Sequence, residues 1–119
     1  MLKRYHGSCH CGAIKFDYEG EEITRGLRCN CSVCSRKAAM MNPEAIPPGK
    51  LRIDADENDI GLYQFGNKVA KHYFCKKCGI YTHNEMLRMP GHSRVNLGCI
   101  ENLDTSDFEI TIFDGKNLL

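Results

Sequence analysis

The sequence has no long hydrophobic run and almost no net charge. Its longest uncharged apolar stretch is residues 38–41, whereas a helix needs about 20 apolar residues to cross a bilayer, so no membrane partner is expected. The formal net charge is +1, basic residues are scattered and no run of aromatic residues occurs, which argues against a nucleic-acid partner. No secretory hydrophobic segment follows the N-terminus, so we expect a cytoplasmic protein.

The sequence also lacks the motifs of several common enzyme classes. It contains no glycine-rich phosphate loop, no serine-nucleophile elbow and no paired-carboxylate motif. It has no low-complexity tract, charge block or internal repeat that would indicate a linker. Its 119 residues fall within the usual size of one domain. We therefore expect a single domain over residues 1–119.

Cysteine, in contrast, is abundant. In a secreted protein the eight cysteines would suggest a disulfide framework, but in a reducing compartment closely spaced cysteines are more often metal ligands. The two cysteines of a Cys-x-Cys pair on a strand point to the same face. This arrangement suits a shared ion better than a mutual disulfide. We therefore interpret the clustered cysteines as zinc ligands.

Seven of the eight cysteines fall into groups whose sizes match two kinds of zinc site. Two pairs make up the four-cysteine cluster, which is Cys9, Cys11, Cys75 and Cys78. The others make up the three-cysteine cluster, which is Cys29, Cys31 and Cys34. A structural zinc takes four protein ligands, so the first cluster is predicted to hold one. Three ligands leave one tetrahedral position open, as in catalytic sites, so the second cluster is predicted to hold a second, catalytic zinc.

The eighth cysteine leaves an alternative open. Cys99 could complete the three-cysteine cluster, and both zinc sites would then be structural. Its neighbours Gly98 and Ile100 place it at the end of an apolar strand. A free cysteine in such a place behaves as a small hydrophobic residue, so core packing is the favoured interpretation.

Basic residues flank the three-cysteine cluster. Arg28, Arg36 and Lys37 would offset the negative charge of three thiolates and would attract an anionic thiol or carboxylate substrate. The alternative is that they are ordinary surface charges, because Lys76 and Lys77 lie beside the other cluster as well. The remaining candidates for ligation or proton transfer are histidines, which we interpret as surface residues: His6, His72, His83 and His92.

Alternating apolar and polar residues predict many short strands and little helix. Strands are expected before and after Gly12 within residues 5–18, and at residues 23–30, 51–53, 62–65, 69–74, 80–83, 93–97 and 108–113. A short helix is expected over residues 32–41 with Ser32 as its N-cap. Gly66 and Asn67 indicate a hairpin turn. The predicted fold class is mainly β, small and stapled by zinc.

The cysteine motifs resemble those of a known family. The segments GSCHCG at residues 7–12, CNCSVC at 29–34 and FCKKCG at 74–79 are similar to those of the glutathione-dependent formaldehyde-activating enzymes, whose domain is shared with centromere protein V. Residues 94–104 resemble the last strand pair of that family. The resemblance implies a small antiparallel multi-sheet β-tent-like fold, a structural zinc on the four-cysteine cluster and a reaction at the three-cysteine cluster.

The resemblance also implies an activity. The family reaction joins glutathione to formaldehyde as S-hydroxymethylglutathione, or cleaves that carbon–sulfur bond. A thiol bound at the open position of a zinc ion is deprotonated and becomes a nucleophile. We therefore expect a zinc-dependent carbon–sulfur lyase with two zinc ions, glutathione as co-substrate, formaldehyde or a related small electrophile, and Cys29, Cys31 and Cys34 at the catalytic site.

A second hypothesis is a non-catalytic zinc-binding module that carries glutathione or binds a protein. Met86, Leu87 and Met89 could form an apolar surface for such a partner, although methionines at this spacing also commonly pack in a core or loop. The ligand at the fourth position of the three-cysteine cluster separates the two hypotheses. An open position favours chemistry, and a protein side chain favours a structural role.

Overall fold

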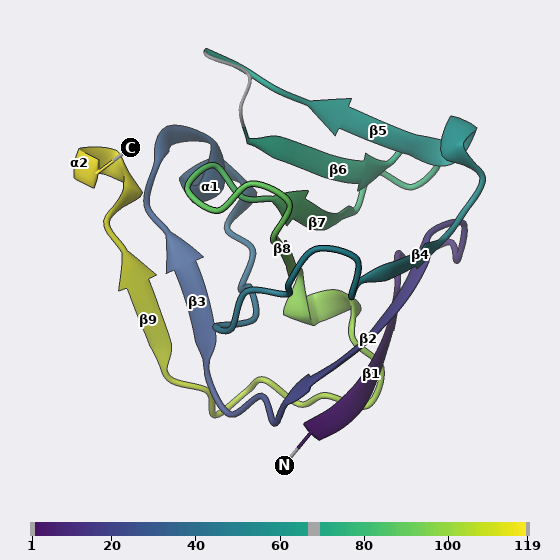
Figure 1. The fold of residues 1–119 in the computed structure, drawn as a ribbon, viewed down its shortest axis with the longest axis horizontal. Helices are drawn as coiled ribbons and strands as arrows, with labels where there is room; N and C mark the ends of the chain where they lie inside the picture. The colour runs from purple at the N-terminus through teal and green to yellow at the C-terminus, as the bar shows by residue number, and fades with distance from the viewer. Residues whose placement is uncertain (1, 67–69, 119) are drawn as a thin grey trace.

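The computed structural model describes residues 2–66 and 70–118, and strands dominate it (Figure 1). The strands are β1 (Leu2–Ser8), β2 (Lys15–Glu21), β3 (Gly26–Cys29), β4 (Arg52–Asp54), β5 (Ile60–Tyr63), β6 (Lys71–Cys75), β7 (Tyr81–Glu85), β8 (Ser93–Val95) and β9 (Ile110–Phe113). The helical elements are α1 (Ser32–Lys37), α2 (Gly115–Leu118) and the short 3-10 turns η1 (Glu57–Asp59) and η2 (Leu97–Cys99). No helix among these residues is long and apolar enough to cross a membrane.

The described strands form three sheets. The order in the first is β1-β2-β4 and in the second β5-β6-β7-β8, and all pairs in both are antiparallel. The third is the pair β3-β9, which is parallel, with Gly26 opposite Ile110 and Cys29 opposite Phe113. The predicted mainly β, multi-sheet class is confirmed. Among the described strands, β3 and β9 form the one parallel pair in this otherwise antiparallel arrangement, and the long chain between them permits it.

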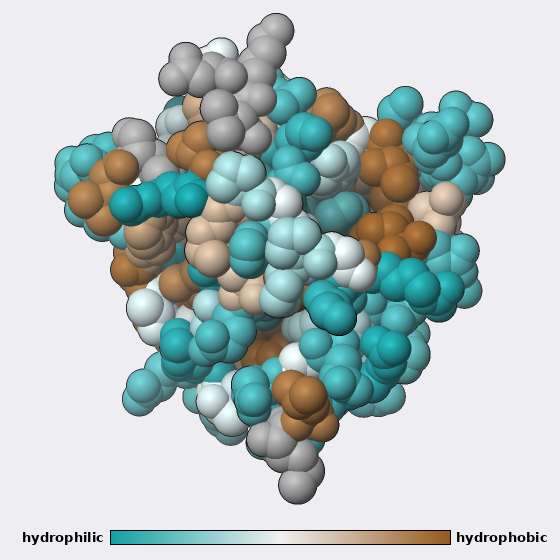
Figure 2. Space-filling model, in the orientation of Figure 1, coloured by the Kyte–Doolittle hydropathy of each residue, from teal (hydrophilic) through white to brown (hydrophobic). Residues whose placement is uncertain are grey.

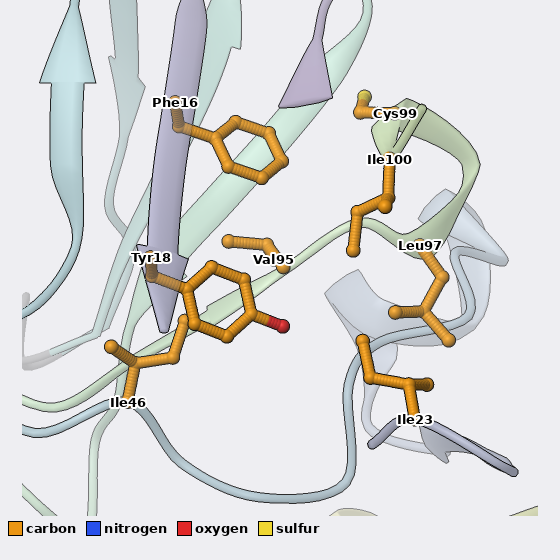
Figure 3. Packing of buried hydrophobic residues seen from close by; sticks show 8 residues of the cluster. All are labelled: Phe16, Tyr18, Ile23, Ile46, Val95, Leu97, Cys99 and Ile100. Atoms are coloured by element: carbon orange, nitrogen blue, oxygen red, sulfur yellow. The ribbon is translucent and has the colours of Figure 1, made fainter. Parts of the chain in front are cut away.

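The main core lies where the sheets meet. In Figure 3 the rings of Phe16 and Tyr18 from β2 point toward Val95 and Ile100. The complete set of buried residues in this cluster is Phe16, Tyr18, Ile23, Ile46, Val95, Leu97, Cys99 and Ile100. Gly7 lies opposite Phe16 in the β1–β2 register, and a Cβ atom at Gly7 would overlap the Phe16 ring. Because Gly7 has no side chain, the Phe16 ring can lie directly against the backbone of β1 at this position.

The first helix differs from its prediction at both ends. Its N-cap is Cys31, which makes no capping hydrogen bond through its side chain, and Ser32 is the first helical residue. The helix ends at Lys37 because Ala38 adopts the left-handed conformation, with φ 54°. Figure 1 shows α1 between the β3–β9 pair and the β5–β8 sheet. The last residue of the helix, Lys37, contacts His72 of β6 and Tyr81 of β7.

Two further expectations concern the loops. The hairpin turn predicted at Gly66 and Asn67 includes Asn67, which lies outside the described residues. The strands that it was expected to join, β5 and β6, do pair antiparallel, with Ile60 opposite Cys75 and Tyr63 opposite His72. On the face drawn in Figure 2, apolar residues form several patches separated by hydrophilic ones.

Candidate functional site

The four-cysteine cluster forms from two tight turns on different sheets. Cys9 and Cys11 follow β1, and the N–H of Gly12 donates to the Cys9 carbonyl at 3.2 Å. Cys75 ends β6, and the N–H of Gly79 donates to the Cys75 carbonyl at 2.8 Å. Gly12 and Gly79 both have positive φ, at 83° and 79°, a conformation that side-chain-bearing residues rarely adopt. Both turns therefore depend on glycine, which lets the backbone reverse so that the sulfurs of each pair face the same point.

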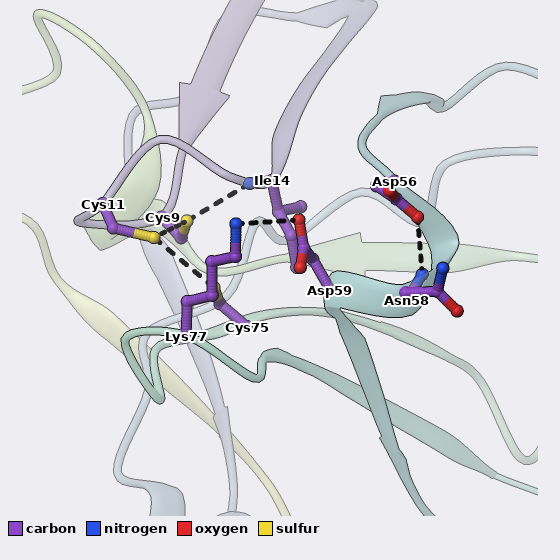
Figure 4. Close-up of polar contacts among 8 residues, drawn as sticks. All are labelled: Cys9, Cys11, Ile14, Asp56, Asn58, Asp59, Cys75 and Lys77. Atoms are coloured by element: carbon purple, nitrogen blue, oxygen red, sulfur yellow. Dashed lines mark hydrogen bonds and ion pairs between the residues drawn. The ribbon is translucent and has the colours of Figure 1, made fainter.

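The spacing of these sulfurs suits a tetrahedral ion. The Cys9 and Cys11 Sγ atoms lie 3.7 Å apart and the Cys11 and Cys75 Sγ atoms 3.6 Å apart (Figure 4). All four sulfurs of the cluster lie within 4.8 Å of one another. For zinc–sulfur bonds of about 2.3 Å, the edge of a tetrahedron of sulfurs is about 3.8 Å. The donor set therefore fits a four-coordinate zinc ion.

Backbone N–H groups stabilise thiolates in this cluster. The backbone groups of Cys11 and Ile80 lower the pKa of the Cys78 thiol to about 6. Burial acts to raise the pKa of Cys9, but the N–H of Ile14, 3.3 Å from its sulfur (Figure 4), contributes to a net lowering. Hydrogen bonds to a metal-binding sulfur favour its ionised form. The charge of nearby Lys77 is paired with Asp59 at 3.6 Å.

The three-cysteine cluster lies where β3 passes into α1. Cys29 ends β3, Cys31 caps α1 and Cys34 lies in its first turn, and their sulfurs all lie within 4.8 Å of one another. Asn30 fixes this connection, because its Nδ2 donates to Asp114 Oδ1 at 3.0 Å and its Oδ1 accepts from the Lys116 N–H at 2.8 Å. Among the described residues no fourth Cys, His, Asp or Glu joins this group. The set therefore resembles a metal site with an open position.

Cys99 lies in the main core and in neither cluster. Its side chain is 8% exposed, its Sγ is 3.7 Å from the Tyr81 carbonyl, and burial raises the pKa of its thiol to about 11. The interpretation of Cys99 as a core residue is confirmed. The alternative in which Cys99 completes the three-cysteine cluster is not supported by the geometry.

Lys37 is the flanking cation that reaches the three-cysteine cluster. Burial raises the pKa of Cys34 to about 12, and the positive charge of Lys37 acts against that rise. For Cys31, burial is outweighed by hydrogen bonds from the backbone and side chain of Cys34 and from the side chain of Cys29, so its pKa is lowered. Arg36 instead donates to the carbonyl of Ser32 at 2.8 Å in an exposed position. Of these two cations of α1, Lys37 therefore supplies charge at the cluster, whereas Arg36 contacts the backbone.

Two of the four histidines are buried, contrary to the prediction of surface positions. His72 and His83 are each 6% exposed, whereas His6 is exposed. The Nδ1 atom of His72 lies 2.8 Å from Lys37 Nζ, and that Nζ lies 3.8 Å from the centroid of the Tyr81 ring. Strand β7 is covered on both faces, as its consecutive buried residues Thr82 and His83 show. Alternation along such strands gives no signal that separates a buried histidine from an exposed one.

A cavity of about 890 Å³ opens beside the three-cysteine cluster, and all three of its cysteines line it. Of the residues that the structure describes, five cations line it, namely Arg25, Lys37, Arg88, Arg94 and Lys116, together with one carboxylate, Glu85. Glu85 is paired with Lys71 at 3.7 Å. Met86, Leu87 and Met89, predicted to form either a partner surface or a packed loop, contribute to the wall of the cavity. Sequence reasoning missed the cavity because its cations are spread over distant segments.

The fold and the two clusters define a small β protein with two cysteine groups able to hold metal ions, one of which, the three-cysteine cluster, lines a large cavity. The chain matches the glutathione-dependent formaldehyde-activating enzyme family over residues 4–115 and belongs to that family. It is also similar to a Rhodobacter sphaeroides protein of known crystal structure, with 34% identity and a TM-score of 0.78. That match covers 89% of this chain and 99% of the other.

Proposed function

We propose that the protein is a zinc-dependent carbon–sulfur lyase of the S-hydroxymethylglutathione synthase type, acting on glutathione and formaldehyde or a related small electrophile. The observation that carries this proposal is the position of the three-cysteine cluster, whose sulfurs line a large cationic cavity without a fourth ligand from the described residues. The cavity volume of about 890 Å³ lies within the range of roughly 300–1,000 Å³ for small-molecule sites. Both substrates can therefore occupy it together.

In this proposal the two clusters have different roles. The four-cysteine cluster holds a structural zinc, and Cys29, Cys31 and Cys34 hold a second zinc at the reaction site. Such an ion, when bound, favours the thiolate form of a coordinated thiol at neutral pH. The chain itself contributes orientation, because Asn30 fixes the segment that bears the sulfurs. Holding the thiol and the aldehyde side by side removes much of the entropic barrier to their reaction.

The charges on the cavity wall support an anionic thiol as the substrate. Glutathione carries two carboxylates and one ammonium, and its thiolate adds a further negative charge. Arg94 is held toward the cavity wall by donating to the carbonyls of Asn42 and Pro43 at 3.0 and 2.7 Å. Arg25, Arg88 and Lys116 are exposed at the rim. A cationic cleft raises the local concentration of an anionic ligand and favours its binding.

The chemistry also fits a compartment in which glutathione is reduced. Glutathione keeps the cytosol reducing, and free thiols persist there. We therefore propose the cytoplasm as the site of action. The metal ligands remain ionisable thiols in that compartment, so zinc can occupy both clusters.

Elemental analysis with glutathione titration tests the proposal. We expect two zinc ions per chain in the wild type and about one in Cys31→Ser, with the fold retained and glutathione binding lost. Cys99→Ala is the matched control, because Cys99 is a buried thiol outside both clusters, and it should keep both ions. Formation of S-hydroxymethylglutathione from ¹³C-formaldehyde, followed by NMR, reports the reaction. Glutathione binding without accelerated adduct formation would instead favour a non-catalytic carrier.

A further inference from the structure

One arginine on the wall of the large cavity is held firmly by the backbone. Arg94 lies on β8, is partly buried and lines the cavity beside the three-cysteine cluster. Its Nη1 donates to the carbonyls of Asn42 and Pro43 at 3.0 and 2.7 Å. Asn42 is itself fixed, because its buried Oδ1 accepts from the Val95 N–H at 2.7 Å. The guanidinium group of Arg94 is therefore held in one orientation.

The other edge of this guanidinium group has unused donors. Nη2 and Nε of Arg94 make no hydrogen bond within the described part of the chain. Neither atom belongs to the fully buried polar atoms that lack a partner, so both are accessible. Because Arg94 lines the cavity, these donors are available to a ligand there. The planar fork of an arginine binds a carboxylate through two parallel hydrogen bonds.

Arg25 adds positive charge beside Arg94. It lies just before β3, lines the same cavity and donates through Nη1 to Thr111 Oγ1 at 3.1 Å. Burial lowers the pKa of Arg94 and the charge of Arg25 lowers it further, whereas the carboxylate of Glu44 acts in the opposite direction. Among the described residues neither arginine forms an ion pair. Two neighbouring cations without an ion-pair partner attract an anion.

The strands place Arg94 at a defined distance from the cysteines. Leu27 and Met41 exchange backbone hydrogen bonds of 2.9 and 2.8 Å and so lie directly opposite each other in an antiparallel bridge. Cys29 lies two residues beyond Leu27. Asn42 lies one residue beyond Met41, on the side away from Cys29, because the bridge is antiparallel. At about 3.3 Å per residue, the Asn42 carbonyl that holds Arg94 lies roughly 10 Å from Cys29 along the strand.

Glutathione has a carboxylate at a matching distance from its sulfur. The glycine carboxylate is six bonds from the sulfur and reaches up to about 7 Å from it, and a hydrogen bond to arginine adds about 3 Å. The carboxylate of free cysteine is three bonds from its sulfur and is too close to it to span this separation. The γ-glutamyl carboxylate has an ammonium group on the same carbon, so two arginines attract it less strongly. The glycine carboxylate therefore fits best.

We propose that Arg94, supported by the charge of Arg25, binds the glycine carboxylate of glutathione through Nε and Nη2 while the thiol lies at the three-cysteine cluster. This inference rests on the proposed function and deepens it. It makes the separation between the cysteines and Arg94 the feature that selects the thiol. A peptide thiol with a C-terminal carboxylate one residue beyond its cysteine is held at two points, whereas cysteine and thiols without a carboxylate are held at one.

The test measures by calorimetry how thiols bind to the zinc-loaded protein. We expect the wild type to bind glutathione about 10- to 100-fold more tightly than its glycine ethyl ester, and similarly more tightly than γ-glutamylcysteine, which lacks the glycine. In Arg94→Gln the preference for glutathione over the ester should fall to about threefold or less. Arg94→Lys, which keeps the charge but not the fork, should recover part of the preference.

Arg88→Gln is the matched control, because Arg88 lines the same cavity but is exposed at its rim. It should keep most of the preference for glutathione over the ester, since its charge acts on both ligands from a distance. Turnover gives a second measurement. Arg94→Gln should raise KM for glutathione and leave kcat nearly unchanged, because the carboxylate contact is the same before and during the reaction.

The outcomes separate this inference from the proposed function. A wild type that binds the ester as tightly as glutathione overturns the carboxylate site, whether or not any variant folds. Equal binding of γ-glutamylcysteine and glutathione overturns the assignment to the glycine end, and an unchanged preference in Arg94→Gln overturns the assignment to Arg94. In each of these cases adduct formation by the wild type leaves the proposed function intact. A wild type that neither binds glutathione nor forms the adduct overturns both.

Discussion

Replacing one cysteine in each cluster should affect the stability of the protein very differently. Cys75 is fully buried and, with Cys9 and Ile14, forms a second core cluster packed by Ile53 and Ile60. Binding at a structural zinc site contributes about 10–16 kcal/mol to folding, whereas a domain is stable by only about 5–15 kcal/mol in total. A site with three ligands keeps only part of that free energy. Cys75→Ala should therefore unfold the protein at ordinary temperatures.

The three-cysteine cluster should behave otherwise. Its cysteines are only partly buried, and helix α1 has no buried residue. Loss of its ion in Cys31→Ala releases a short segment without opening the core, which we expect to cost less than about 2 kcal/mol. For a domain of this size that corresponds to a fall in Tm of less than roughly 10 °C.

Thermal unfolding followed by circular dichroism, with zinc measured in the same samples, checks this difference. Cys99→Ala is the control, because it removes a buried thiol outside both clusters and should cost about 1–2 kcal/mol while keeping both ions. Titration with a chelator should remove one ion before the unfolding transition and the second together with it. If Cys31→Ala and Cys75→Ala lost the same stability, the assignment of separate structural and catalytic roles would be wrong.

Three further predictions follow from single contacts. Gly7→Ala should lower the free energy of unfolding by about 1–3 kcal/mol in urea titrations, because its Cβ would overlap the Phe16 ring. Gly20→Ala is the control and should cost much less, because a Cβ at Gly20 would lie 3.1 Å from the nearest atom of the Tyr18 ring. Equal costs for the two variants would contradict the overlap. Arg88→Gln should weaken glutathione binding, measured by calorimetry, by roughly threefold to tenfold at low salt and by less at high salt. Arg36→Gln is the control and should leave binding unchanged, because Arg36 does not line the cavity. Burial lowers the pKa of His83 from 6.5 to about 4. Between pH 6.5 and 4 the unfolded chain therefore binds a proton at His83 that the folded chain does not bind, so the stability of the fold falls as the pH drops through this range. His83→Phe should reduce this loss by about 1–3 kcal/mol between pH 6.5 and 4, and an unchanged loss would show that His83 does not carry it.

The cysteine groups could be predicted from the sequence because the members of each pair, and of the triplet, lie within a few residues of one another in the chain. A pair such as Cys75 and Cys78 is brought together by one turn, so its spacing is itself the geometric information. The assignment of Cys9 and Cys11 to the same site as Cys75 and Cys78 followed from the four protein ligands that a structural zinc takes. The strands followed from alternation, with boundaries displaced by a few residues, as at Lys71–Cys75. The assignment of zinc and of one domain to the whole chain stays a prediction.

The cavity and the contacts of Lys37 on its wall could not be predicted for a corresponding physical reason. Lys37, His72 and Tyr81 are separated along the chain, and only the packing of α1 against the β5–β8 sheet brings them together. Strand β2 illustrates the same difficulty, since Phe16, Asp17 and Tyr18 are all buried in succession. Asp17 is accommodated by Arg4 and Arg52 at 3.3 and 2.8 Å. Where both faces of a strand are covered, alternation no longer reports exposure.

The two clusters differ in how far apart in the sequence their cysteines lie. The four-cysteine cluster joins the turn after β1 to the turn after β6, and thus links the β1-β2-β4 sheet to the β5–β8 sheet. Closing so long a loop restricts the unfolded chain strongly, so an ion there stabilises the whole fold. The three-cysteine cluster spans only residues 29–34 and closes almost no loop. An ion bound at this site would therefore contribute little to folding, and its loss would not loosen the domain.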